Sequence, residues 1–285
     1  MPLIRIRNLH HEYRNEDGTS LRALKGINLE IREGEHVCLV GANGSGKSTL
    51  LLHLNALLLP TEGDVEISGW STRDESSLVK IRSTVGMVFQ SPDTQIIASV
   101  VEEEVAFGPE NIGVPEHKLE QRVDEALQEV GLLELRNRPS RLLSAGQKQL
   151  LAIASTLSMK PRCIALDEAT SMLDPASRRR FLERVENLNR EGMTIISATH
   201  NMDEAALARR MIVLSGGKVI ADSSPLEIFS RKDLLREARL DLPSSLKLAH
   251  KVGERLPRFR SSALSVDVLA EEIDQYLLRK DWIGS

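Results

Sequence analysis

The chain has 285 residues, of which 41% are hydrophobic and 27% are charged, as in ordinary globular proteins. Its 37 Lys and Arg residues against 41 Asp and Glu residues leave a net charge of −4, which gives no reason to expect nucleic-acid binding. The longest apolar stretch, residues 50–59, falls short of the roughly 18 residues of a transmembrane helix and is interrupted by His53 and Asn55. We therefore expect a cytosolic protein whose membrane role, if it has one, comes through a partner.

Predicted strands and helices alternate along most of the chain. Alternating or wholly apolar runs predict strands, in chain order, at 3–7, 24–31, 37–40, 65–67, 85–89, 163–166, 194–198, 211–214 and 218–221. Helical periodicity predicts helices from residue 47, over most of 100–132, at 145–159 and at 177–190. Apolar strands that alternate with helices indicate an α/β fold with a mostly parallel sheet.

The polarity of the chain changes in two places. Residues 78–143 are mainly helical and polar, and we expect an inserted helical subdomain there. Near residue 240 the pattern changes to two amphipathic helices, 243–256 and 265–278, around a basic linker. The expected organisation is a main domain over 1–240 and a small helical extension over 241–285.

Several chemically capable side chains receive no functional role. Cys38 and Cys163 lie inside apolar runs, which favours small buried hydrophobic residues over a disulfide or a metal site. Four histidines lack a supporting motif: His10, His11, His36 and His53.

A phosphate-binding pattern lies between a predicted strand and a predicted helix. Residues 41–48, Gly-Ala-Asn-Gly-Ser-Gly-Lys-Ser, fit G-x-x-x-x-G-K-[ST] in the structural context that the pattern requires. Glycines let backbone N–H groups face the phosphates, Lys47 reaches the β- and γ-phosphates, and the Ser48 hydroxyl is a ligand for Mg²⁺. The expected nucleotide-binding residues here are Gly41, Asn43, Gly44, Ser45, Gly46, Lys47, Ser48 and Thr49.

Two carboxylates follow the predicted strand 163–166. Ligands bind at the carboxyl ends of strands in open α/β sheets, which places Asp167 and Glu168 near the phosphates. Asp167 is expected to hold Mg²⁺, directly or through water. Glu168 is the candidate base for the attacking water.

Further motifs resemble the ATP-binding-cassette (ABC) family, over about residues 1–240. Residues 143–147, Leu-Ser-Ala-Gly-Gln, are similar to the family's signature motif, and Ser171-Met172-Leu173-Asp174 to its D-loop. The resemblance implies a P-loop ATPase fold with an antiparallel N-terminal β part, ATP and Mg²⁺ as cofactors, and ATP hydrolysis coupled to transport. The implied roles are catalytic for Glu168, His200 and Gln90, metal-binding for Ser48, Gln90 and Asp167, adenine-stacking for Tyr13, and nucleotide-binding across a dimer for Ser144, Gly146, Gln147 and Asp174.

A narrower resemblance concerns the energy-coupling-factor (ECF) importers of vitamins and transition metals such as cobalt and nickel. Residues 105–111, Val-Ala-Phe-Gly-Pro-Glu-Asn, follow Gln90 as in the ATPases of that group, and the two C-terminal helices resemble its dimerisation tail. The resemblance implies a homodimer, or a heterodimer with a second ABC ATPase, on the cytoplasmic face of the membrane. Implied partners are a membrane coupling subunit and a membrane subunit that selects the cargo, so the cargo is not encoded here.

Other functions stay open. The chain could serve another ABC importer, or it could be a soluble ABC protein of translation or DNA repair. Translation-type members usually carry two cassettes, and repair-type members carry a coiled coil that is too long for residues 49–142. A scaffold that binds ATP without turnover is disfavoured by Glu168 and His200. Ala145 departs from the glycine usual in the signature, and its methyl group could crowd the phosphate of a partner's nucleotide.

Overall fold

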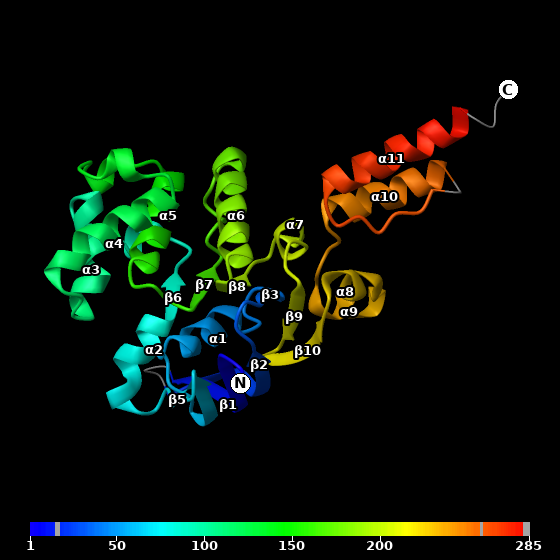
Figure 1. Cartoon of the computed structure of the whole chain (residues 1–285). Coiled ribbons are helices and arrows are strands. Elements are labelled where there is room, and N and C mark those ends of the chain that lie inside the picture. Colours follow the sequence, from blue (N-terminus) through cyan, green and yellow to red (C-terminus); the bar gives the residue numbers. More distant parts are fainter. Residues whose placement is uncertain (15–17, 257–258, 282–285) are drawn as a thin grey trace.

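A six-stranded, mostly parallel sheet forms the centre of the computed structural model, which describes residues 1–14, 18–256 and 259–281 (Figure 1). The strand order is β10-β9-β3-β8-β7-β6, and only the β9–β10 pair is antiparallel. The strands are β3 (His36–Val40), β6 (Val85–Val88), β7 (Cys163–Asp167), β8 (Thr194–Ala198), β9 (Arg210–Ser215) and β10 (Lys218–Ser223).

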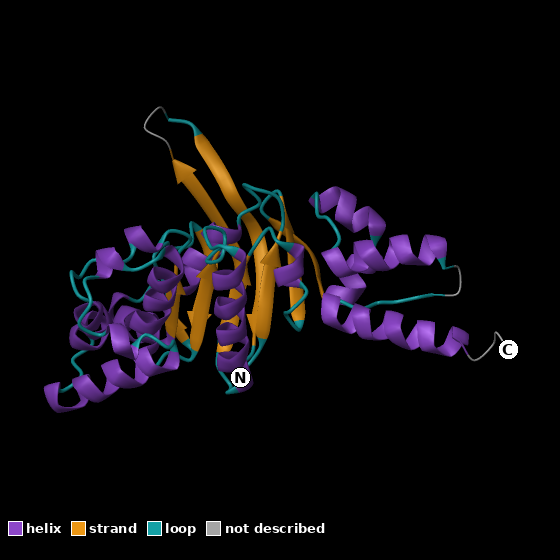
Figure 2. Cartoon of the chain, turned by 90° about the horizontal axis from the view of Figure 1, so that it is seen from above, coloured by secondary structure: helices purple, strands orange, loops and turns teal. Residues whose placement is uncertain are grey.

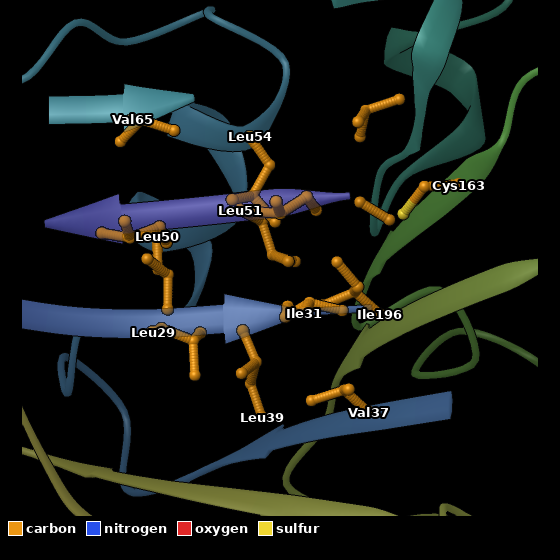
Figure 3. Close-up of a cluster of buried hydrophobic side chains, with 14 of the residues drawn as sticks. Leu29, Ile31, Val37, Leu39, Leu50, Leu51, Leu54, Val65, Cys163 and Ile196 are labelled. Carbon is orange, nitrogen blue, oxygen red and sulfur yellow. The ribbon is translucent and has the colours of Figure 1, made fainter. Parts of the chain in front are cut away.

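The apolar runs of the central strands are buried on both faces of this sheet. In β3, Val37 and Leu39 pack in a core shared with the helix α1 (Lys47–Leu54), whereas Cys38 and Val40 pack in a core on the other face. Figure 3 shows the first of these cores, where side chains from α1 meet those of the strands. Successive side chains of a strand point to opposite faces, so a wholly apolar strand needs cover on both.

A second, antiparallel sheet covers the α1 side of the molecule. Its order is β2-β1-β4-β5, and all its pairs are antiparallel. The strands are β1 (Ile4–Arg14), β2 (Ser20–Ile31), β4 (Glu62–Ile67) and β5 (Trp70–Ser71). Alternate residues of β1 and β2 enter the shared core, which explains their apolar–polar alternation.

Helices beyond the β6 edge form a separate layer, at the left of Figure 1. They share an apolar core with β7, β8 and α6. The helices of this layer are α3 (Val101–Asn111), α4 (Glu116–Glu129) and α5 (Ala145–Leu157), with the 3₁₀ turns η2 (Pro92–Thr94), η3 (Leu133–Leu135) and η4 (Ser140–Leu142). The helix α6 (Pro175–Arg190) packs against them. The helix α2 (Leu78–Thr84) and the 3₁₀ turn η1 (Glu75–Ser77) precede β6, and α2 packs in the core that contains α1. The strand β6 lies inside the stretch 78–143 that we expected to be an insertion, but it belongs to the parallel sheet, so the separate helical layer starts after it.

The C-terminal helices lie at the opposite end of the molecule, as Figures 1 and 2 both show. They are α8 (Pro225–Ser230), α9 (Lys232–Ala238), α10 (Ser244–Arg255) and α11 (Val266–Asp281), whereas the short helix α7 (Met202–Ala205) follows β8 and lies beside the central sheet. The last two pack on each other through a small core that includes Ala249 and Leu269. The ring of Phe259 meets that of Tyr276 edge-on, with centroids 5.5 Å apart.

These features confirm the predicted α/β fold with a mostly parallel sheet, an antiparallel N-terminal part, an inserted helical layer and a helical C-terminal extension. Within the described residues, none of the helices is long and apolar enough to cross a membrane. Both cysteines are buried and form no disulfide, and burial raises the pKa of the Cys38 thiol to about 12. They fill space as small hydrophobic residues, as the sequence indicates.

Candidate functional site

The loop between β3 and α1 passes so close to neighbouring backbone that two of its positions require glycine. A Cβ on Gly41, at φ 150°, would lie 2.2 Å from the carbonyl oxygen of Leu214. One on Gly46, at φ 105°, would lie 2.9 Å from the carbonyl oxygen of Ala23. The helix α1 begins immediately after, at Lys47, and no side chain of the described residues caps its first turn. Its N–H groups and its dipole are thus available to an anion.

Lys47 is a nearly buried cation beside this loop. Its Nζ donates hydrogen bonds to the carbonyl oxygens of Gly41, at 2.9 Å, and Ala42, at 3.3 Å. Burial lowers the pKa of the ammonium group, and the carboxylates of Glu168 and Asp167 oppose that shift. The positive charge is therefore held between the loop and two acidic groups, where it can attract a polyphosphate.

Ser48 and Asp167 place two hard oxygen atoms side by side. The Ser48 hydroxyl donates a hydrogen bond to Asp167 Oδ1 at 2.9 Å. Burial raises the pKa of Asp167, the bond from Ser48 lowers it, and the neighbouring Glu168 raises it again. The described residues hold no cluster of three or more His, Cys, Asp or Glu side chains suited to a metal. A pair of oxygens is what Mg²⁺ uses when phosphates and waters complete its shell.

Glu168 lies where three neighbouring strands end. Gln90 follows β6, Glu168 follows β7, and His200 follows β8, and these strands are adjacent in the sheet. Gln90 Nε2 donates to Glu168 Oε2 at 3.5 Å, and His200 Nδ1 lies 3.4 Å from the same oxygen. Glu168 has φ 46°, an uncommon value for a residue with a side chain, and its N–H donates to the carbonyl of Ala198 at 2.9 Å. The backbone is thus fixed in an unusual conformation at this carboxylate.

A cleft of about 510 Å³ joins the phosphate loop, Gln90, Asp167 and Glu168. His200 lines a separate pocket that Glu168 also lines, and Gly41 lines neither. Tyr13 lies at the edge of the cleft, and its hydroxyl is 3.2 Å from Thr49 Oγ1. The predicted residues that line the cleft are Tyr13, Asn43, Gly44, Ser45, Gly46, Lys47, Ser48, Thr49, Gln90, Asp167 and Glu168. The sequence predictions missed other lining residues, namely Leu21, Arg22, Ala23, Lys25, Gly216 and Gly217. Only the hairpin glycines carried a signal, a turn pattern, and Gly217 N–H donates to the carbonyl of Ser45 at 3.2 Å.

Glu204 is a second omission of the sequence predictions. Its side chain, 9% exposed, accepts hydrogen bonds from the hydroxyls of Thr170, at 2.7 Å, and Thr199, at 3.0 Å. Thr170 belongs to the turn after Glu168, and Thr199 immediately precedes His200. Glu204 therefore holds together the two turns that carry Glu168 and His200. Glu204 lies four positions after His200, but this spacing is common in proteins and does not by itself predict a structural role for Glu204.

Comparison with known families agrees with this geometry. Residues 24–171 match the model of the ABC transporter family. The chain belongs to that family. Its members are ATPases that bind ATP, so the ATPase activity inferred from the sequence motifs is confirmed at the level of the family.

Relatives within the ABC family match the chain over almost its whole length. An energy-coupling factor transporter ATP-binding protein, EcfA1 of Clostridium novyi, is 44% identical over 274 residues, which are 96% of this chain and 98% of that protein. EcfA1 of Symbiobacterium thermophilum is 50% identical over 90% of each chain. The solved structure of CbiO1 from Clostridium perfringens, part of the ABC transporter complex CbiONQ, has a TM-score of 0.73 and 36% identity over 90% of this chain and 96% of its own. These findings confirm the resemblance to the ECF group.

The remaining ABC motif residues lie outside the cleft. Ser144 and Gln147 form a capping box at the start of α5, and Asp174 caps α6 by accepting from two backbone N–H groups. A Cβ on Gly146 would lie 2.7 Å from Ser177 Oγ, so α5 and α6 touch here. Ala145 is exposed and stands within the first turn of an intact helix. Within one chain Ser144, Gln147 and Asp174 cap the N-termini of α5 and α6. The structure does not bring the signature residues to the phosphate loop of the same chain.

Proposed function

We propose that the chain is the ATP-hydrolysing subunit that powers import of a micronutrient, a vitamin or a transition-metal ion such as cobalt or nickel, through an ECF-type transporter. The observation that carries the proposal is the convergence of Gln90 and His200 on the carboxylate of Glu168, beside Lys47 and Asp167. That arrangement suits hydrolysis of a bound triphosphate rather than binding alone. The near full-length likeness to EcfA1 proteins supports the ECF assignment.

Glu168 acts as the general base in this proposal. Its carboxylate accepts a proton from a water that attacks the γ-phosphate. His200 and Gln90 lie 3.4 and 3.5 Å from Glu168 Oε2, close enough to orient that carboxylate and the water. Lys47 and the N–H groups at the start of α1 stabilise the negative charge of the phosphates.

Mg²⁺ fits the oxygen pair of Ser48 and Asp167. The Ser48 hydroxyl would be a ligand, and Asp167 would hold the ion directly or through water. The two oxygens are 2.9 Å apart. Gln90 is the third proposed ligand. When bound, the ion neutralises charge on the β- and γ-phosphates.

Two chains pair head to tail in this proposal. Ser144, Gly146, Gln147 and Asp174 do not line the cleft of their own chain, and in this proposal they contact ATP held by a second ABC ATPase. The pair is a homodimer or a heterodimer. The solved dimer of a bacterial ABC transporter cassette that is 32% identical to this chain has a matching fold, with a TM-score of 0.70 over 78% of this chain. ATP stabilises the closed pair because its affinity for that state is higher.

An apolar groove next to Gln90 is the proposed contact with the membrane coupling subunit. The groove, of about 520 Å³, lies between α3 and the end of β6, and Phe89 lines it. Exposed apolar side chains along it include Val79, Ile97 and Phe107. Gln95 ties the Gln90 loop to this wall, because its side chain accepts from the N–H of Phe89 and donates to the carbonyl of Met87. Movement at Gln90 is thereby transmitted to the groove.

This assembly places the chain on the cytoplasmic face of the membrane. The cargo is chosen by a separate membrane subunit that carries the substrate site, and nucleic acid has no part. The alternatives are that the chain is the ATPase of another ABC importer, or that it is a soluble ABC protein. Recovery of the chain with ribosomes or DNA instead of membranes would favour the soluble alternative.

The test is to purify the tagged chain with its membrane partners in detergent and reconstitute the complex in liposomes. We expect ATP-dependent uptake of one of a panel of radiolabelled vitamins, cobalt or nickel, and none with the Glu168→Gln variant. A complex that hydrolyses ATP but accumulates no member of the panel would contradict the micronutrient assignment while leaving the ATPase assignment intact.

A further inference from the structure

Two buried histidines lie directly behind Tyr13. The ring of His11 meets the ring of Tyr13 edge-on, with centroids 4.6 Å apart and an interplanar angle of 74°. On its other side, His11 meets the ring of His53 in the same way, at 4.7 Å and 78°. His11 is 6% exposed and His53 is fully buried. The three rings form a continuous series of T-shaped contacts, from Tyr13 at the edge of the cleft to His53 in the core.

Hydrogen bonds fix both histidines in one arrangement of protons. His53 Nδ1 lies 2.7 Å from the carbonyl oxygen of Thr49, which only accepts, so Nδ1 carries the proton and donates. His53 Nε2 is then an acceptor, 3.1 Å from His11 Nδ1. His11 Nδ1 therefore carries its own proton, which also faces the carbonyl oxygen of Leu59 at 3.3 Å. The two rings are locked to each other and to α1.

This arrangement requires His53 to be neutral. Burial lowers the pKa of His53 to about 4, and the bond to the Thr49 carbonyl opposes that shift without cancelling it. A doubly protonated ring has two donors and could not accept from His11. Near neutral pH His53 is therefore neutral and can accept the hydrogen bond from His11.

Thr49 connects His53 to Tyr13. Its carbonyl binds His53, and its hydroxyl lies 3.2 Å from the hydroxyl of Tyr13. Thr49 and His53 both belong to α1, the helix that opens at the phosphate loop. The tyrosine is therefore held at its hydroxyl by Thr49 of α1 and at its ring, through His11, by His53 of α1.

We propose that His11 and His53 are positioning residues that hold the Tyr13 ring in place for the nucleotide base, and so contribute to the affinity for ATP as opposed to its triphosphate alone. This inference rests on the proposed ATPase function and on the adenine contact that the resemblance to ABC proteins implies for Tyr13. The histidines do not touch the nucleotide. They reduce the number of orientations that the tyrosine ring adopts before binding, which lowers the entropic cost of binding the base.

The experiment compares equilibrium affinities for Mg-ATP and for inorganic triphosphate, which lacks the base. His53→Leu and His11→Leu are expected to weaken ATP binding about 3- to 10-fold and to leave triphosphate binding within about twofold, as loss of one ordered aromatic contact implies. His11→Phe can keep an aromatic contact with Tyr13 but loses the hydrogen bond to His53, so it should weaken ATP binding less than His11→Leu does. His36→Leu makes the same change at a nearly buried histidine that does not line the cleft, and should change neither affinity.

Equal losses of ATP and triphosphate affinity in His53→Leu would show a distorted α1, and would overturn the proposal. Unchanged ATP affinity in both leucine variants would overturn it as well. If His53→Leu fails to fold, the His11 pair of variants decides alone, since His11→Leu and His11→Phe must differ. Tyr13→Ala is the separate test of the underlying contact: equal ATP and triphosphate losses there refute the adenine role of Tyr13 itself.

Discussion

The hydroxyl of Ser48 and the carboxylate of Asp167, 119 residues apart in the chain, lie 2.9 Å apart beside the phosphate loop. The bond joins the first turn of α1 to the carboxyl end of β7. The phosphate loop and the strand β7, which the sequence predicts separately, thus come into contact at this hydrogen bond. The proposed metal site consists of one residue from each.

Removing the carboxylate charge of Asp167 should remove the effect of Mg²⁺ on nucleotide affinity. In the wild-type chain we expect ATP to bind more weakly when EDTA replaces Mg²⁺. In Asp167→Asn the carboxylate charge is lost, so the affinities measured with and without Mg²⁺ should converge to within about twofold, a difference of about 0.4 kcal/mol. Isothermal titration in both buffers measures this. A variant that keeps the full response to Mg²⁺ would place the metal elsewhere.

Replacing Lys47 with alanine should weaken ATP binding at least about a hundredfold, a loss of about 2.7 kcal/mol, because the phosphates lose a partly desolvated point charge. Lys148→Ala is the matched control. Lys148 pairs with Asp93 outside the cleft, so its loss removes a positive charge without touching the phosphate loop. Equilibrium titration with a fluorescent ATP analogue measures both. Wild-type affinity in Lys47→Ala would refute the phosphate-loop assignment.

The C-terminal extension presents apolar side chains that its own chain does not cover. Leu277 and Leu278 on α11 are 48% and 67% exposed. If the extension pairs two chains, Leu277→Asp with Leu278→Asp should weaken nucleotide-independent dimerisation at least tenfold by sedimentation, because charges enter an apolar contact. Val79→Asp introduces the same charge on an exposed apolar residue of the groove and should leave dimerisation unchanged. Equal dimerisation of the double variant and wild type would exclude a pairing role for this face.

The stability of the chain should fall as the pH drops from about 6.5 towards 4. Burial lowers the pKa values of His36 and His53 to about 4 from 6.5. Between these values the unfolded chain binds protons that the folded chain does not, so acid favours unfolding. Each histidine is expected to account for roughly 2 kcal/mol between pH 7 and pH 5. Urea unfolding at both pH values, with His36→Leu for comparison, measures this, and an unchanged loss in that variant would contradict the assignment to His36.

The sequence could predict what depends on local pattern. Apolar runs located the buried strands, and a strand followed by glycines and Lys47 located the phosphate loop. Glu168 could be placed near the phosphates because it follows a parallel strand, whereas Gln90 and His200 were assigned to the site through their resemblance to ABC motifs. The structure brings the three together because each follows one of three adjacent strands. The contacts of Glu204 and of His53 could not be predicted, since they join helices and turns whose relative positions depend on packing of the whole core.

The central claim is that Glu168 is the base for ATP hydrolysis, and Glu168→Gln tests it most directly. The amide keeps the size of the side chain but cannot accept the proton. Bound ATP should be retained, turnover should fall by about 10²–10⁴, and the ATP-bound dimer should accumulate on size exclusion with ATP and Mg²⁺. In a heteromeric pair both sites must carry the change. Phosphate release at the wild-type rate from the variant would show that Glu168 is not the base.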